Sequence, residues 1–211
     1  MNQAIAHIIR DYIGHLDFVD KIAGLTSIST FEIRGPDNAM KQITVPIACC
    51  VTPEECDREG AYYDLMPNSQ YKTVIYFEDG GVSFVRSESN WKYYTSNLRL
   101  VCWINIELLT HSGICKSDIP CTYAAHIITE IIRHLPEFPK HVSPLSFVYS
   151  EITGQAIRSA SIFGAYTYDE KHSQYLMAPY DYFALDIKTD FAICLRGLDV
   201  YDATCVPGHG S

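Results

Sequence analysis

Two long stretches decide the expected fold of this chain. Residues 97–109 read NLRLVCWINIELL, and residues 182–196 read YFALDIKTDFAICLR. Apolar side chains occupy even positions from Leu98 to Leu108 in the first stretch, and nearly all odd positions from Phe183 to Leu195 in the second. A period of two places each set on one face of a pleated strand. Because most strands run to about five or six residues, these two predict a large sheet that extends, curls or pairs with a neighbour.

The remaining elements complete an α+β pattern. Amphipathic helices are predicted over residues 3–23, ended by Gly24, and over residues 120–135, ended by Pro136. Shorter strands are expected over residues 30–34, 41–51, 71–78, 82–91, 145–152 and 162–168. The tripeptide Asp79-Gly80-Gly81 between two β-rich runs predicts a hairpin turn, because glycine readily adopts a positive φ.

These elements predict one α+β domain over residues 1–211. Its sheet is expected to be mostly antiparallel and curled, with two amphipathic helices packed on one face and a long projecting β-hairpin. Residues 140–181 are a candidate insertion within this domain.

Composition favours a protein that assembles over one that binds nucleic acid by charge. Charged residues make up 19% of the chain and there are 15 tyrosines, so much of the surface must be neutral, as at subunit interfaces. The formal net charge is −9 with no basic run, which argues against attraction to phosphates. An acidic surface suits a passage through which DNA slides without sticking, and it equally serves solubility alone.

The start of the chain has no basic region followed by an apolar run, which predicts no signal peptide. No stretch approaches the roughly 18–20 apolar residues of a membrane-spanning helix, so no membrane partner is expected. Without a secretory signal, the eight cysteines are expected as free thiols of a reducing compartment. They are Cys49, Cys50, Cys56, Cys102, Cys115, Cys121, Cys194 and Cys205.

The chemistry-bearing residues give only weak candidates. Cys115 and Cys121 have His111 and His126 nearby, which makes these four candidates for a metal site or for a cysteine nucleophile with a histidine base. Five residues separate the two cysteines, whereas zinc-binding pairs usually have about two to four between them. Buried or loop thiols are the alternative interpretation.

No catalytic signature is present in the sequence. The motifs G-x-S-x-G, H-E-x-x-H, G-x-G-x-x-G and G-x-x-x-x-G-K-[ST] do not occur. No catalytic residue and no cofactor are therefore assigned, and the protein is expected not to be an enzyme.

An aromatic strip crowds the predicted hairpin and its exit. In one interpretation the hairpin folds over its own core; in the other it projects, and its aromatic side chains meet a neighbouring subunit, where such residues often dominate binding. The hypothesised interface residues are Tyr76, Phe77, Phe84, Trp91, Tyr93 and Tyr94.

The order of elements resembles the neck and tail-completion proteins of tailed bacteriophages, the tail terminators in particular. The resemblance rests on the helix around Ile5–Ile22, the ribbon 71–109, the helix 120–135 and the strand 181–187, DYFALDI. It covers most of the chain but includes no diagnostic peptide. The composition also resembles that of virion neck proteins of crAss-like phages, although the segment 140–181 is longer than a minimal terminator carries.

The resemblance implies a virion protein that assembles in the host cytoplasm as a ring, a cyclic homo-oligomer. It would act as a head-tail connector or terminator between portal and tail, contacting adjacent neck, portal or tail proteins and leaving a channel for DNA. Two alternatives remain: a small cytosolic enzyme or ligand-binding domain with a site built from residues distant in sequence, and a metal-binding domain organised by Cys115, Cys121 and a histidine.

Overall fold

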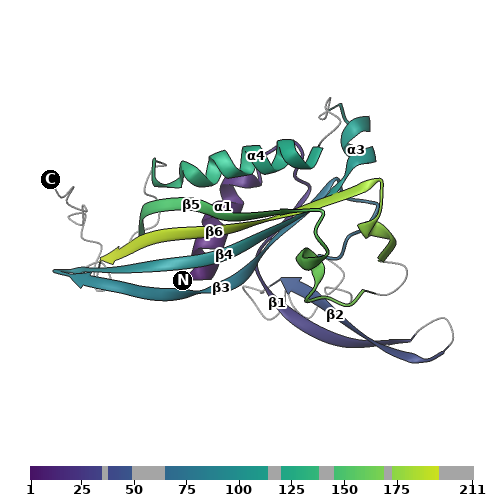
Figure 1. The fold of residues 1–211 in the computed structure, drawn as a ribbon, viewed down its shortest axis with the longest axis horizontal. Helices are drawn as coiled ribbons and strands as arrows, with labels where there is room; N and C mark the ends of the chain where they lie inside the picture. The colour runs from purple at the N-terminus through teal and green to yellow at the C-terminus, as the bar shows by residue number, and fades with distance from the viewer. Residues whose placement is uncertain (35–37, 49–64, 114–119, 138–144, 169–172, 195–211) are drawn as a thin grey trace.

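The computed structural model describes residues 1–34, 38–48, 65–113, 120–137, 145–168 and 173–194, which form helices around one sheet (Figure 1). The helices are α1 (Asn2–Ile13), α3 (Ile106–His111) and α4 (Pro120–Arg133), with 3-10 turns at Leu135–Glu137, Ala160–Phe163 and Gln174–Leu176. The strands are β1 (Lys21–Arg34), β2 (Met40–Ala48), β3 (Thr73–Glu88), β4 (Trp91–Asn105), β5 (Leu145–Ile157) and β6 (Tyr180–Cys194).

The six strands lie in the order β2-β1-β3-β4-β6-β5. All neighbours are antiparallel except β1 and β3, which run parallel. The two long strands predicted from alternation are β4 and β6, which are inner strands of the sheet and pair along their whole length of 15 residues. The α+β class and the mostly antiparallel sheet are thus confirmed. Within the described residues the order is open, with β2 and β5 as its outer strands.

The first face of the sheet carries the larger core. Leu100 and Leu185 lie opposite each other on it and are fully buried. Ile9 of α1 and Ile128 of α4 belong to the same cluster of buried side chains. Figure 1 shows α4 running along the strands while α1 crosses them. Burying these apolar side chains contributes roughly 1.5–3 kcal/mol for each large one.

The second face is covered in part by residues 162–168 and 175–176, which lie between β5 and β6 in the sequence. Trp103 of β4 packs there with Phe163 and Tyr166. Its indole Nε1–H donates a hydrogen bond of 2.7 Å to the backbone carbonyl of Tyr175, which ties residues 174–176 to the sheet. Because β5 pairs with β6 from Leu145 to Ile157, the candidate insertion 140–181 supplies an integral strand.

The N-terminal helix is shorter than predicted. It ends at Ile13, where the backbone N–H of Gly14 caps the carbonyl of Arg10, and the expected stop at Gly24 is wrong because Gly24 lies inside β1. The apolar residues beyond Gly14 still recur at helical spacing, but they lie in a turn and in β1. Phe18 enters the core, and its carbonyl accepts a hydrogen bond of 2.8 Å from the Thr73 hydroxyl.

The predicted hairpin turn at Asp79-Gly80-Gly81 is also wrong. These residues form an irregularity inside β3, and the chain reverses at Ser89 and Asn90. The Asp79 carboxylate accepts the backbone N–H of Gly81, whose φ of 90° needs glycine. A positive φ at Ser89, 50°, accompanies the true reversal. Glycine here makes a bulge, which is the other common use of this residue in strands.

Three further boundaries differ from the sequence prediction. The long stretch 97–109 leaves the sheet at Asn105, whose side chain accepts the Leu108 N–H at 3.2 Å and caps α3. Residues 162–168 form a 3-10 turn and a single bridge between Thr44 and Thr167 instead of a strand. The strands predicted over residues 30–34 and 41–51 are β1 and β2, which pair from Thr26 opposite Ala48 to Arg34 opposite Met40. Residues 49–51 of the second predicted strand lie outside the described residues.

Candidate assembly surfaces

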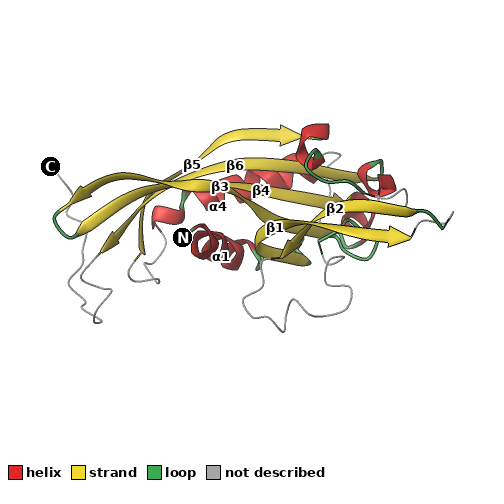
Figure 2. Cartoon of the chain, turned by 90° about the horizontal axis from the view of Figure 1, so that it is seen from below, coloured by secondary structure: helices red, strands yellow, loops and turns green. Residues whose placement is uncertain are grey.

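The far half of the sheet is four-stranded: the ends of β3, β4 and β6 extend beyond the helices, whereas β5 lies alongside α4 (Figures 1 and 2). We call it the blade: residues 78–88 of β3, 91–99 of β4, 186–194 of β6 and 145–154 of β5. Its strands are held together by pairing from Glu88 opposite Trp91 to Leu145 opposite Ile193. The predicted projecting hairpin, β3 and β4, is therefore one side of a four-stranded part of the sheet and is joined along β4 to β6.

One edge of the blade is open along β3. The parallel strand β1 pairs with β3 only between Lys21 and Leu25; from Thr26 onward it pairs with β2 and leaves as a separate two-stranded ribbon (Figure 1). Among the described strands, residues 78–88 of β3 thus have a partner on the β4 side alone. The side chains from Asp79 to Glu88 are exposed apart from Val82, as expected for a free edge.

The opposite edge of the blade is open along β5. This strand pairs with β6, and no described strand lies on its other side. It has 13 residues, none of which is proline, and interruptions of the regular register between Phe147 and Tyr149 and between Ile152 and Gly154. An open edge presents unpaired backbone N–H and C=O groups that can template another strand.

An aromatic row crosses the first face of the blade from edge to edge. Phe84, Tyr94, Phe191 and Phe147 lie opposite one another on β3, β4, β6 and β5. The rings of Tyr94 and Phe191 stack with centroids 5.6 Å apart, and Phe84 meets Tyr94 edge-on at 5.7 Å. The outer end of the row is free, because Phe84 is 58% exposed.

The six predicted interface aromatics divide into two groups. Tyr76 and Phe77 are wrong as interface residues, because both are buried within the subunit, Tyr76 on the second face and Phe77 on the first. The other four lie on the blade and are at least partly accessible: Phe84, Trp91, Tyr93 and Tyr94. The Arg86 guanidinium lies 4.5 Å from the centre of the Tyr93 ring, a cation–π contact.

A row of charges crosses the second face at the base of the blade. Arg99 of β4 lies between Glu78 of β3 and Asp186 of β6, with its Nε 3.9 Å and 3.8 Å from the two carboxylates. These side chains line a hollow of about 280 Å³. The row ends at Gly154 on β5, opposite Asp186. A side chain has no room there, because a Cβ would lie 2.6 Å from Asp186 Oδ2.

Tyrosines border this charged row. The Tyr166 hydroxyl donates to Glu78 Oε1, and burial followed by this carboxylate raises the pKa of Tyr166. Burial, and then the neighbouring phenols, raise the pKa of Tyr76 well above its usual value. Burial is also the main cause of the raised pKa of Tyr168. These hydroxyls therefore stay protonated and act as packing groups with polar tips.

The base of the open β3 edge is anchored by the first turn of α1. The buried Asn2 side chain donates to Asp79 Oδ1 and, at 3.2 Å, to the backbone carbonyl of Asn97. Its Oδ1 accepts the buried Ser96 hydroxyl at 2.6 Å. The role of Asn2 has no signal in the sequence, because a polar residue at a helix start is typical of the surface.

Of the four metal and nucleophile candidates, the structure describes the side chains of the two histidines. His111 and His126 are exposed, and His111 Nδ1 lies 2.7 Å from the backbone oxygen of Glu107. Cys115 and the side chain of Cys121 lie outside the described residues. Among the described residues no group of three or more histidine, cysteine or carboxylate side chains is placed to hold a metal ion.

Two described cysteines correct the expectation for the thiols. Cys194 is disulfide-bonded, so the expectation of eight free thiols is wrong for this residue. Cys102 is a free thiol buried in the core, and burial raises its pKa well above the usual value, so it is unsuited to act as a nucleophile.

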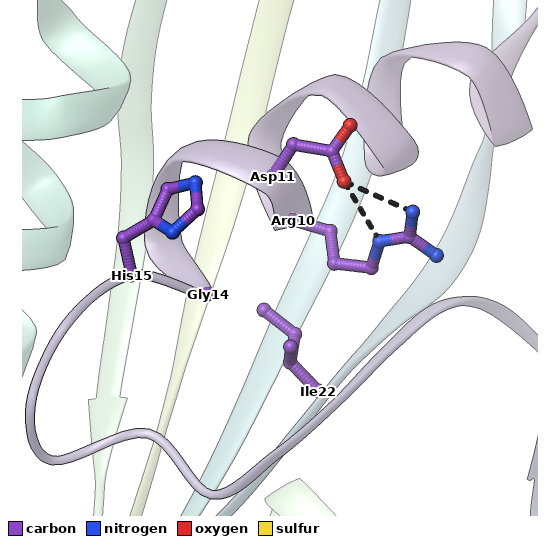
Figure 3. Close-up of a pocket in the computed structure, with 5 residues that line it drawn as sticks. All are labelled: Arg10, Asp11, Gly14, His15 and Ile22. Atoms are coloured by element: carbon purple, nitrogen blue, oxygen red, sulfur yellow. Dashed lines mark hydrogen bonds and ion pairs between the residues drawn. The ribbon is translucent and has the colours of Figure 1, made fainter.

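A second hollow, of about 450 Å³, lies beside the end of α1 (Figure 3). It is lined by Arg10, Asp11, Gly14, His15 and Ile22. The Arg10 guanidinium already donates two hydrogen bonds to Asp11 Oδ1, at 2.9 and 3.1 Å. The charged groups at this surface therefore satisfy each other.

Comparison with known proteins assigns no family: no family model matches the chain, and no curated protein matches it. None of the helices in the described part of the chain is long and apolar enough to cross a membrane.

Proposed function

We propose that this chain is a structural virion protein of a tailed bacteriophage that works by assembling into a ring of identical subunits. The ring would sit at the neck, between portal and tail, and leave a channel for DNA. The protein does no chemistry in this proposal. Its role is to close the junction mechanically and to offer flat faces to the adjacent portal, neck or tail proteins.

The observation that carries this proposal is the pair of open edges on opposite sides of one sheet. A contact between two different surfaces of the same protein is repeated by rotation, and it closes into a ring when the rotation divides a full turn. Pairing between strand edges would also remove the aggregation hazard that a long free edge presents. The tail-terminator resemblance and the absence of a basic run in the sequence agree with a channel that passes DNA without holding it.

Electron microscopy of the purified protein tests this proposal. Negatively stained particles are expected to be annular, uniform in diameter and hollow at the centre. If they are single globular subunits at every concentration, the proposal fails. Genes for portal and capsid proteins beside this one would support the phage assignment, and a neighbourhood of metabolic genes would contradict it.

A small-ligand-binding domain is the second candidate function, favoured by the hollow around Glu78, Arg99 and Asp186. These residues are far apart in sequence and supply two carboxylates against one guanidinium, so a cationic ligand suits the site better than an anionic one. A small diamine serves as the probe, with thermal unfolding as the measurement. This function requires a rise in the melting temperature that Asp186→Asn abolishes.

A further inference from the structure

The two open edges of the blade match in length and in level. Residues 78–87 of β3 and residues 145–154 of β5 run alongside the same stretch of β4 and β6. In an antiparallel ladder, alternate residues direct both backbone groups outward, so each edge presents about five or six outward-facing residues. Each edge therefore leaves a similar number of hydrogen bonds to be made.

Exposed apolar side chains gather at the same level on both edges. Phe84 and Val85 on β3 are more than half exposed, and Val148 and Tyr149 on β5 are half exposed. All four lie at or beside the aromatic row, whose inner rings are Tyr94 and Phe191. Large apolar groups at both ends of one row are costly in water and are typical of contact sites.

We propose that the β3 edge of one copy pairs with the β5 edge of the next copy, with Phe84 opposite Phe147 of the neighbour. This inference rests on the proposed ring and names the contact that builds it. The strands β3, β4, β6 and β5 alternate in direction. A neighbour continuing the sheet in the same orientation therefore brings its β3 antiparallel to β5.

This register keeps the two faces of the sheet continuous. Phe84 and Phe147 both lie on the first face, so the aromatic row runs on into the next copy. On the second face, Ser83 meets Tyr149, because both lie at the level of the central pair formed by Thr95 and Asp190. A slip by one residue would turn every side chain to the wrong face.

Charges agree with the same register. The β3 acids Glu78 and Asp79 face Gly154 and Ile152 across the boundary, because these residues share their levels of the sheet. The single acid of β5, Glu151, faces the glycines of the β3 bulge. No like charges lie directly opposite, which would destabilise the pairing.

The irregularities of the two strands also restrict the choice of partner. Val85 is the extra residue between Phe84 and Arg86, and Val148 is the extra residue between Phe147 and Tyr149. Bulges make an edge a poor template for regular strands. The two bulges flank the aromatic row on opposite sides, so in the proposed register they lie one on each side of the pair Phe84–Phe147, and a flat, regular strand matches neither edge.

Photo-crosslinking tests the contact without altering the native cysteines. The variant Phe84→p-benzoylphenylalanine keeps an aromatic group at position 84, and equal amounts of isotope-labelled and unlabelled protein are mixed before irradiation. We expect crosslinks between labelled and unlabelled copies that map to residues 145–149. The matched control is Tyr123→p-benzoylphenylalanine on α4, at a residue 51% exposed against 58% for Phe84, which should give none there.

A second pair of variants measures the strength of the contact. Phe84→Lys places a charge in the proposed boundary and is expected to weaken self-association by about 10-fold or more, whereas Tyr123→Lys leaves it unchanged. Circular dichroism and thermal unfolding of the dissociated subunits check that both variants remain folded.

The outcomes separate this inference from the proposed function. An oligomer that persists in Phe84→Lys, with crosslinks from position 84 to any segment other than β5, overturns the edge pairing and leaves the ring standing. Crosslinks from position 84 to position 84 indicate a two-fold contact and overturn the head-to-tail pairing. A wild-type protein that stays monomeric overturns both.

Discussion

The substitution Asn2→Leu tests how the open β3 edge is held in place. Leucine has nearly the same shape as asparagine but forms none of its three hydrogen bonds, to Asp79, to the Asn97 carbonyl and from Ser96. At about 1 kcal/mol net for each bond, the free energy of unfolding should fall by about 3 kcal/mol. Part of this loss arises because the Ser96 hydroxyl, only 1% exposed, keeps no partner and cannot reach water.

The effect of Ser96→Ala on the free energy of unfolding is expected to change sign between the wild type and the Asn2→Leu variant. In the wild type, Ser96→Ala removes a bonded hydroxyl and should lower the free energy of unfolding by about 1 kcal/mol. In the Asn2→Leu background, the same change removes an unsatisfied hydroxyl and should raise it by about 1 kcal/mol. Urea unfolding of the four proteins, followed by circular dichroism, measures both values.

The neighbouring residue supplies the matched control. Gln3 is exposed on α1, so Gln3→Leu should change the free energy of unfolding by less than about 0.5 kcal/mol. A loss below about 1 kcal/mol for Asn2→Leu, or additive effects of the two substitutions, would refute the anchoring role of this network.

Three other changes have defined outcomes. Gly154→Ala should cost about 1 kcal/mol in urea unfolding, because its Cβ would meet Asp186 Oδ2 at 2.6 Å, and Asp186→Ala should relieve that cost; a cost that persists argues against this clash. Trp103→Phe should cost about 2–4 kcal/mol, since the Tyr175 carbonyl loses its donor and the core loses volume; a change below 1 kcal/mol would contradict that packing. Burial, and then Arg10, lower the pKa of His7 in the folded state, so the unfolded chain binds protons more readily below the usual value of 6.5. The stability gap between wild type and His7→Gln should therefore shift against the wild type as the pH falls below about 6.5, and a gap independent of pH would be inconsistent with the burial of His7.

The strands β4 and β6 could be predicted because the alternation of apolar and polar residues extends over nearly the whole of each strand. The alternation through Leu98, Leu100 and Cys102 is set by burial on one face, and burial dominates the energetics of a strand. Helix α4 was found for the same reason, since Ile128 and Ile132 share one apolar stripe.

The glycine-containing turn signals were less informative, because the same residues suit more than one local structure. Asp79-Gly80-Gly81 suits both a tight turn and a bulge, and the side chain that contacts Asp79 in the bulge, Asn2, is far away in sequence. Gly14 and Gly24 both follow apolar residues at helical spacing, so either could end the helix. The helix ends at Gly14, and the residues around Gly24 pair with β3 as part of β1.

The candidate surface could be predicted only in part. The aromatic character of residues 84–94 is visible in the sequence, and it located Phe84 and Tyr94. The sequence did not indicate that Tyr76 and Phe77 point into opposite cores or that β5 carries the other open edge. Those facts depend on strand order, which a single sequence does not reveal.

The mass of the native particle tests the central claim most directly. Sedimentation of the wild-type protein over its whole soluble concentration range should give one species whose mass is a fixed integral multiple of 23.8 kDa, in exchange with free subunits on dilution. A single species of 23.8 kDa at every concentration would contradict the claim that the two strand edges serve to join copies of this chain.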